Sequence, residues 1–238
     1  MRRRPTARRS LPRLAAALLA FSVALAGGLS LRPAEPAEAR HVCQLSGART
    51  VLGDRNARMV TRAATVAPRY RVTRYYGCRY RTNRFFRLAD VGEPGLFSDR
   101  VEPRRLAGVF AGFAGAYQEP AGEQQLAYVR ALDLRSGRVR VREQAIADAG
   151  PSESYRVSDL ELRYTGGLAW IVERRSFAQG PDAPVITYEV HKVDRGGRQR
   201  LDAGPDVEPA SLTLSGATIS WRRAGVTRTA ILGSAPSG

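Results

Sequence analysis

The chain contains few of the residues that commonly serve as catalysts or metal ligands. It has two histidines, His41 and His191, two cysteines, and a single lysine, Lys192, in 238 residues. It has no G-x-S-x-G, H-E-x-x-H or P-loop pattern and no G-x-G-x-x-G after a strand. A Ser-His-acid triad would have to use one of the two histidines. His191 lies in an alternating segment, where we expect an exposed or rim position. We therefore assign no catalytic, cofactor-binding or metal-binding residue and expect no cofactor.

Helical periodicity is missing after residue 39, and strict alternation takes its place. In the clearest stretch, apolar residues occupy every second position on both sides of Thr165-Gly166-Gly167, at Leu160, Leu162, Leu168, Trp170 and Val172. Alternation around a glycine turn predicts a β-hairpin with one buried face. Ile186, Tyr188 and Val190 lead to a second turn at 194–197. This stretch therefore predicts four short strands.

Similar hairpin pairs precede and follow this stretch. Their segments are Arg105–Tyr117 with Gln125–Arg138, Ser211–Gly225 with Arg228–Leu232, and, more faintly, Ala57–Ala63 with Arg74–Leu88. An aromatic residue closes the second strand in three of the units, as Tyr117, Trp170 and Trp221. Self-similarity at a regular spacing indicates stacked or radially arranged units. An ordinary β-meander is the alternative. If the repeat is real, Trp170 and Trp221 fill matching core positions.

The N-terminus has the features of an export signal. Six arginines and no acid precede residue 14, an uncharged segment follows from Leu14 to Leu31, and Ala37-Glu38-Ala39 resembles a cleavage site. Cleavage would leave Arg40 first; an uncleaved membrane anchor is the alternative. We expect residues 40–232 to form a single β-repeat domain of about four units and residues 233–238 to be a flexible tail.

Export also bears on the two cysteines, Cys43 and Cys78. An even pair in an exported chain usually forms a disulfide. Free thiols or metal ligation are less favoured, because no further cysteine exists and histidine is scarce. We predict a Cys43–Cys78 bond.

The charge is strongly positive, at +16 for the full chain. Arginines and aromatic residues interleave between Arg69 and Arg87, a composition that can bind polyanions by charge and stacking. The candidate polyanion surface consists of Arg69, Arg71, Arg74, Arg79, Arg81 and Arg84. The alternative is a solvated face rich in arginine because of genomic composition. Possible partners are an anionic envelope polymer or another protein. No nucleic acid is expected for an exported chain, and the membrane is a partner only through an uncleaved anchor.

A resemblance to known proteins rests on four segments: YYGCRYRTNRFFRLAD, YVRALDLRSGR, SDLELRYTGGLAWI and LDAGPDVEPASLTLSGATISW. The chain resembles β-propeller repeat proteins and, more narrowly, a family of secreted proteins of high-GC actinobacteria. The resemblance implies an all-β fold of antiparallel four-stranded units in a small or incomplete β-propeller. A β-sandwich is the second choice. With room for about four units, either the N-terminal strands complete the last unit or the ring stays open.

Two functions follow as hypotheses. The first is an exported, non-enzymatic binding or scaffolding protein, either secreted or associated with the cell envelope. The alternative is an extracellular hydrolase that uses carboxylates at the mouth of the ring. The candidate acids are Asp90, Asp99, Glu102, Asp133, Asp148, Glu153, Asp159, Glu161, Asp194, Asp202, Asp206 and Glu208.

Overall fold

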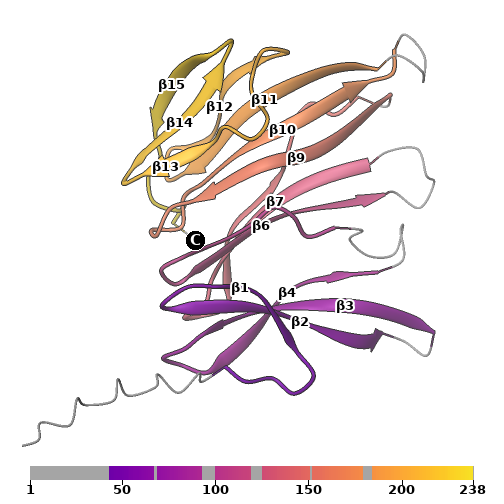
Figure 1. The fold of residues 1–238 in the computed structure, drawn as a ribbon, viewed down its shortest axis with the longest axis vertical. Coiled ribbons are helices and arrows are strands. Elements are labelled where there is room, and N and C mark those ends of the chain that lie inside the picture. Colours follow the sequence, from indigo (N-terminus) through magenta and orange to yellow (C-terminus); the bar gives the residue numbers. More distant parts are fainter. Residues whose placement is uncertain are drawn as a thin grey trace, which may run out of the picture. The chain divides into compact units, whose positions relative to one another are not determined.

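The computed structural model describes residues 43–66, 69–92, 100–118, 125–150, 152–178 and 184–237. All regular elements in these ranges are β-strands, so the predicted all-β class is confirmed (Figure 1). None of these ranges contains a helix long and apolar enough to span a membrane. Proximity of Cα atoms divides the chain into Met1–Ala39 and Arg40–Gly238. The predicted signal, its cleavage site and His41 lie outside the described residues.

The first unit is a four-stranded antiparallel sheet in chain order. Its strands are β1 (Arg49–Gly53), β2 (Ala57–Val66), β3 (Tyr70–Arg79) and β4 (Arg84–Val91). The β1–β2 turn is closed by Asp54, whose carboxylate accepts hydrogen bonds from the backbone N–H groups of Asn56 and Ala57. One register shift in the β3–β4 ladder leaves Leu88 as an extra residue between Arg87 and Ala89.

The second and third units are antiparallel meanders of four strands each. The second contains β5 (Arg104–Ala107), β6 (Phe110–Gln118), β7 (Gln125–Asp133) and β8 (Arg138–Gln144). The third contains β9 (Glu153–Leu162), β10 (Leu168–Ser176), β11 (Val185–Asp194) and β12 (Gly197–Gly204). A single parallel pair, Gln125 of β7 with Ser154 of β9, joins the two units into one eight-stranded sheet.

The fourth unit has only three strands, β13 (Thr213–Ser215), β14 (Thr218–Arg223) and β15 (Val226–Ile231). Within the described part of the chain, no strand of the first unit pairs with them. The predicted four-stranded units are thus confirmed, with an incomplete last unit and an open ring.

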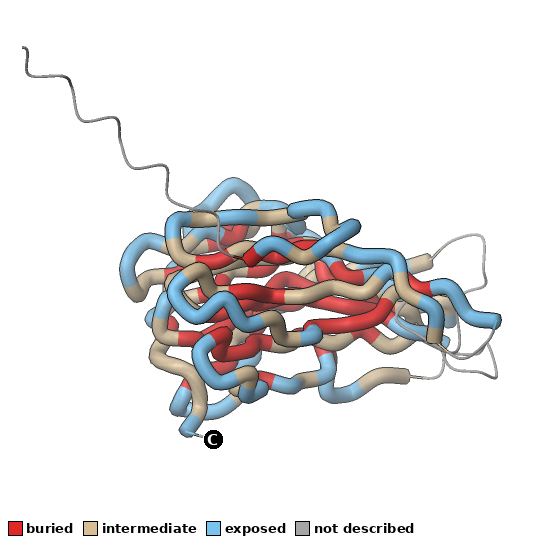
Figure 2. Tube along the Cα trace, turned by 90° about the horizontal axis from the view of Figure 1, so that it is seen from below, coloured by how far each residue is buried: buried red, intermediate tan, exposed pale blue. Residues whose placement is uncertain are grey.

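Three hydrophobic clusters hold the units together, one between each consecutive pair. The buried parts of the strands lie in the interior of the fold, and the exposed parts lie toward its outside (Figure 2). Met59 and Leu88 of the first unit pack with Phe113 and Leu134 of the second. A Cβ at Gly77 would lie 2.6 Å from a methyl group of Leu134, so any larger residue at this position would displace the buried Leu134 side chain.

The third unit carries the other two clusters on its opposite faces. One face packs on the second unit, with Val129 and Trp170 in the same cluster. The other face packs on the fourth unit through Ile171 and Trp221. Successive residues of β10 therefore serve two different interfaces, which is why this strand is buried over its first six residues.

The first strands of consecutive units lie next to one another. β1 is close to β5, β5 to β9, and β9 to β13. One edge of every unit therefore borders a common side of the fold, and residues distant in sequence meet there.

Two expectations about aromatic residues have different outcomes. Trp170 and Trp221 are 0% and 4% exposed, and each lies on the second strand of its unit. Tyr117, the third member of the predicted series, is 38% exposed, so it is not an equivalent core residue. It lies near the end of β6, where its ring contacts Tyr128.

His191 is buried, contrary to the expected exposed or rim position. Its ring stacks on Trp170 at a centroid distance of 5.3 Å, and its Nε2 lies 2.9 Å from a carboxylate oxygen of Glu189. Burial lowers the pKa of His191. The second unit thus covers the face of β11 that carries His191, although the sequence pattern predicted that this face is exposed to solvent.

The predicted tail also differs from expectation over its first residues. The Gly233 N–H donates to Asp194, Ser234 accepts from the Arg195 N–H, and the Ala235 N–H donates to Thr165. These bonds satisfy backbone groups at two turns of the third unit, so 233–235 are held in place.

Candidate functional site

The positive charge is concentrated in the first unit. Residues 43–92 contain eleven arginines and only two acids, Asp54 and Asp90, for a net charge of +9. Residues 93–238 contain 19 basic and 18 acidic residues, for a net charge of +1. The first unit therefore carries nearly all of the attraction for anions after residue 39.

This unit presents a basic face, which we define as Arg62, Arg74, Tyr76 and Arg87. Alternate residues of β2 and β3 point to opposite sides, and the side with Met59 and Tyr75 packs on the second unit. Arg62, Arg74 and Tyr76 lie on the other side. Arg87 of β4 is the cross-strand partner of Tyr76. The face thus runs across three strands.

A single carboxylate lies at the centre of the basic face. Asp90 Oδ1 accepts from Arg74 Nε at 2.9 Å and from Arg87 Nε at 3.0 Å, and its Oδ2 accepts a second bond from each guanidinium. The hydrogen bonds to Asp90 raise the pKa of Arg74. Two cations thus share one anion, and the cluster keeps a positive charge.

Arg62 increases this imbalance. It is directly opposite Arg74 in the β2–β3 ladder and is exposed, with no ion pair to any residue in the described ranges. Like charges facing each other across strands destabilise a sheet. The arrangement costs stability unless an external anion neutralises it.

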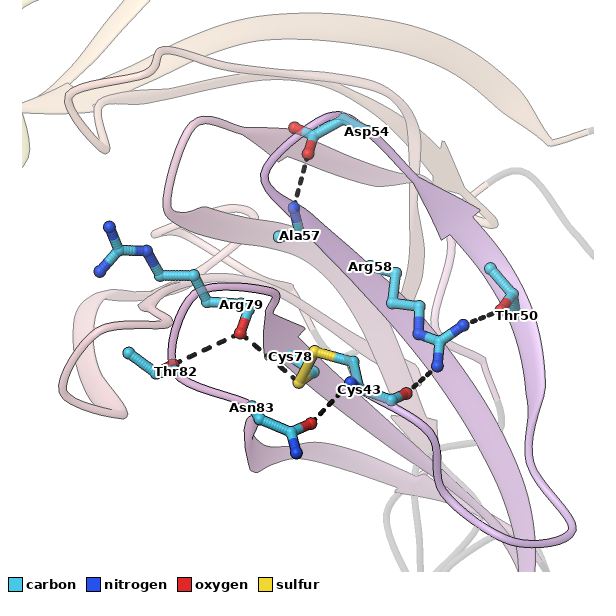
Figure 3. Close-up of a disulfide and its surroundings, with 9 residues drawn as sticks. All are labelled: Cys43, Thr50, Asp54, Ala57, Arg58, Cys78, Arg79, Thr82 and Asn83. Atoms are coloured by element: carbon cyan, nitrogen blue, oxygen red, sulfur yellow. Dashed lines mark hydrogen bonds between the residues drawn. A yellow bond between two sulfur atoms is a disulfide. The ribbon is translucent and has the colours of Figure 1, made fainter. Parts of the chain in front are cut away.

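The predicted disulfide is confirmed and lies on the same side of the sheet (Figure 3). Cys43 and Cys78 are bonded, with their Cα atoms 6.0 Å apart. The Cys43 N–H donates to Asn83 Oδ1 at 2.6 Å, and Arg58 donates to the Cys43 carbonyl. These contacts fasten the segment before β1 over one end of the sheet.

The structure does not gather the predicted polyanion surface into one patch. Arg69 and Arg71 lie at the β2–β3 end of β3, whereas Arg79, Arg81 and Arg84 lie at its β3–β4 end. Ten strand residues separate the two ends by about 30 Å. Arg74 alone belongs to the basic face, and Arg84 lies over the Phe86 ring.

Sequence reasoning missed Arg62 and Arg87, which complete the basic face. The signal that could have found them is the scarcity of acids in this unit, because Asp90 must then serve several arginines. Their common face depends on the extra residue Leu88, which brings Asp90 opposite Arg74.

Most candidate carboxylates take part in structural ion pairs. Burial alone would raise the pKa of Asp133, but hydrogen bonds from Arg135 hold the pKa below its usual value. Asp202 is similarly bound by Trp221 and Arg223, and its pKa is also lowered against the effect of burial. In the described ranges, no three histidines, cysteines or acids come together as a metal site.

Asp159 and Glu161 also pair with an arginine, but their pKa values are raised. Both lie on β9 and bind the same guanidinium, that of Arg105, at 3.3 and 3.2 Å. Burial raises the pKa of each, against the opposing effect of Arg105. Asp159 also accepts the N–H groups of Leu160 and Leu212.

Comparisons with known proteins give no family. No protein-family model matches the chain, and no curated protein matches it. The resemblance to secreted proteins of high-GC actinobacteria therefore stays a prediction.

Two solved structures are similar to parts of the chain. An α-L-arabinanase of Penicillium chrysogenum, in complex with arabinobiose, aligns with 76% of this chain and 60% of its own, at 12% identity and a TM-score of 0.38. The polysaccharide lyase Uly1 aligns with 80% of this chain and 50% of its own, at 10% identity and a TM-score of 0.46. The chain spans about half to three fifths of these proteins' lengths. Alignments this loose assign no chemistry to the groups described above.

Proposed function

We propose that the protein is exported and binds an anionic polymer of the cell envelope through the basic face of its first unit. The observation that carries the proposal is the excess of guanidinium over carboxylate on that face, where Arg62, Arg74 and Arg87 surround Asp90 alone. Arginine forms paired hydrogen bonds to phosphate and carboxylate oxygens. The Cys43–Cys78 bond supports export, because disulfides persist in oxidising compartments.

A polymer suits the face better than a bilayer does. Surfaces that dock on membranes insert large apolar side chains. Among the described residues of the first unit, Tyr70 is the only large hydrophobic side chain that is exposed, and it lies at the end of β3, four residues from Arg74. A sheet with charges on three neighbouring strands instead presents repeated contacts to a linear anion.

The test removes charge from the face and, in a matched control, from elsewhere. The double variant Arg62→Gln/Arg87→Gln is expected to bind polyphosphate about tenfold more weakly, because each lost charge-assisted contact weakens binding. The control Arg138→Gln/Arg195→Gln removes two exposed arginines of the second and third units. Affinity is measured by titration at two salt concentrations, where the variant also shows a smaller salt dependence.

Equal weakening in both double variants would mean that net charge, and not this face, attracts the polymer. Binding to anionic vesicles with no binding to polyphosphate would assign the face to a membrane instead. Either result overturns the proposal.

A second candidate is the carboxylate-dependent hydrolase. Asp159 and Glu161 favour it, because a general acid needs a raised pKa and these two neighbouring acids have one. Glu161→Gln is expected to reduce the release of sugar reducing ends from acidic polysaccharides by about 100-fold or more. Glu208→Gln, on the last unit, is the control. Absence of any such release by the unmodified protein removes this candidate.

A further inference from the structure

A groove follows the first strands of the first three units, separate from the basic face. It has a volume of about 310 Å³ and is lined by Leu52 of β1, by Arg104 and Arg105 of β5, and by Arg156 and Ser158 of β9. A second hollow, of about 200 Å³, continues from it to Glu173 and Arg175 of β10. The two hollows form one site, because they share four lining residues: Arg100, Glu102, Arg156 and Val157.

Most charged groups along this groove are paired. Arg104 donates to Glu102 at 3.1 Å, and its guanidinium lies 5.7 Å from the centre of the Tyr75 ring. Arg105 is bound by Asp159 and Glu161, as described above. Arg175 is bound by Glu173.

Arg100 and Arg156 differ from these. Both are exposed, and neither guanidinium has an ion pair or hydrogen bond to a described residue. Their backbones are nevertheless fixed. Arg100 forms a bridge with Ala116 and precedes the buried Val101, and Arg156 pairs with Glu173 and precedes the buried Val157. Two unneutralised donors are therefore held at the place where the hollows meet.

We propose that this groove binds a hydroxylated carboxylate of the size of a uronic acid residue, with Arg100 and Arg156 holding the carboxylate. The groove and its ion pairs contain five arginines (Arg100, Arg104, Arg105, Arg156, Arg175) and four acids (Glu102, Asp159, Glu161, Glu173), for a net charge of +1. A monoanion neutralises this charge. A phosphate monoester brings about −1.5 to −2 and would be repelled by the four nearby carboxylates.

The exposed carboxylate and the size of the groove indicate what the ligand contains besides its carboxylate. The Glu102 side chain is 62% exposed, so the carboxylate oxygen that does not bind Arg104 can accept hydrogen bonds from ligand hydroxyl groups. A volume near 300 Å³ is at the lower end for ligand pockets, which suits one or two sugar residues. A hydroxylated, singly charged ligand meets all of these conditions.

Titration calorimetry with galacturonic acid and its dimer tests the site. The comparison ligands are galactose, which has no negative charge, and galactose 6-phosphate, whose phosphate carries more than one negative charge. Binding of the acids and not of the comparison ligands is expected. Arg156→Gln and Arg100→Gln should each weaken the binding by about 10- to 100-fold, the range for a lost hydrogen bond to a charged group. Arg138→Gln, an exposed arginine of β8, should leave it unchanged.

Binding of galactose as tight as that of galacturonic acid would overturn the proposal, as would tighter binding of galactose 6-phosphate. Unchanged affinity in both arginine variants would do the same. The proposal is independent of polymer binding at the first unit. Arg62→Gln/Arg87→Gln should keep full affinity for galacturonic acid, and Arg156→Gln should keep its affinity for polyphosphate.

Discussion

Trp170→Ala is expected to lower the free energy of unfolding by about 3–5 kcal/mol. Trp170 is fully buried between the second and third units, and its indole N–H donates to the Ala145 carbonyl at 2.9 Å. Its ring stacks on the ring of His191, which lies on the neighbouring strand β11. The Arg198 guanidinium lies 5.6 Å from the centre of the Trp170 ring. Alanine would leave a cavity at the interface and remove one of the two hydrogen bonds that the Ala145 carbonyl accepts, the other coming from Arg198. Urea unfolding followed by circular dichroism gives the change.

Tyr164→Ala is the control for this variant, because Tyr164 is also aromatic and on the third unit but is 63% exposed. Surface substitutions usually change stability by less than about 0.5 kcal/mol. Equal stability losses in the two variants would mean that Trp170 is not the anchor of the interface.

Replacing both cysteines by alanine is expected to cost about 3–4 kcal/mol. The bond closes a loop between residues separated by 35 positions, so its loss gives the unfolded chain much more freedom. The segment at Cys43 would then be held mainly by Asn83 and Arg58. Thermal and urea unfolding of Cys43→Ala/Cys78→Ala measure the effect.

The unmodified protein in a reducing agent is the matched control, since it loses the bond while keeping both sulfur atoms. It should unfold at nearly the same denaturant concentration as the double variant. Two alkylatable thiols in the native, oxidised protein would contradict the bond itself.

Alternation in the sequence was enough to predict the hairpins. Leu160, Leu162, Leu168 and Trp170 point to one side because strand geometry repeats every two residues, whatever covers them. The pattern does not say which unit covers which part of a strand. Tyr117 therefore looked equivalent to Trp170, although the described contacts leave its ring partly exposed at the end of β6. His191 was misplaced for the same reason, since the second unit buries its face.

The basic face could be predicted only in part. Arg74 was identified because it lies in the arginine-rich segment, but Arg62 and Arg87 become its neighbours through strand register. The extra residue Leu88 decides this register, because a regular ladder would place Ala89 opposite Arg74 in place of Asp90. A one-residue shift leaves no mark in the composition. Arg100 and Arg156 were missed similarly, because their common groove forms where the first strands of different units meet.

The three hydrophobic clusters have a consequence for local unfolding. Each cluster joins two consecutive units, so breaking one leaves the others intact. The fourth unit has three short strands and a single cluster, whereas the third is held on both faces. Opening can therefore begin at β13–β15 and stop there, with a free energy well below that of global unfolding. Backbone amides of β15 then exchange with solvent through this partial opening, whereas those of β10 exchange only through global unfolding.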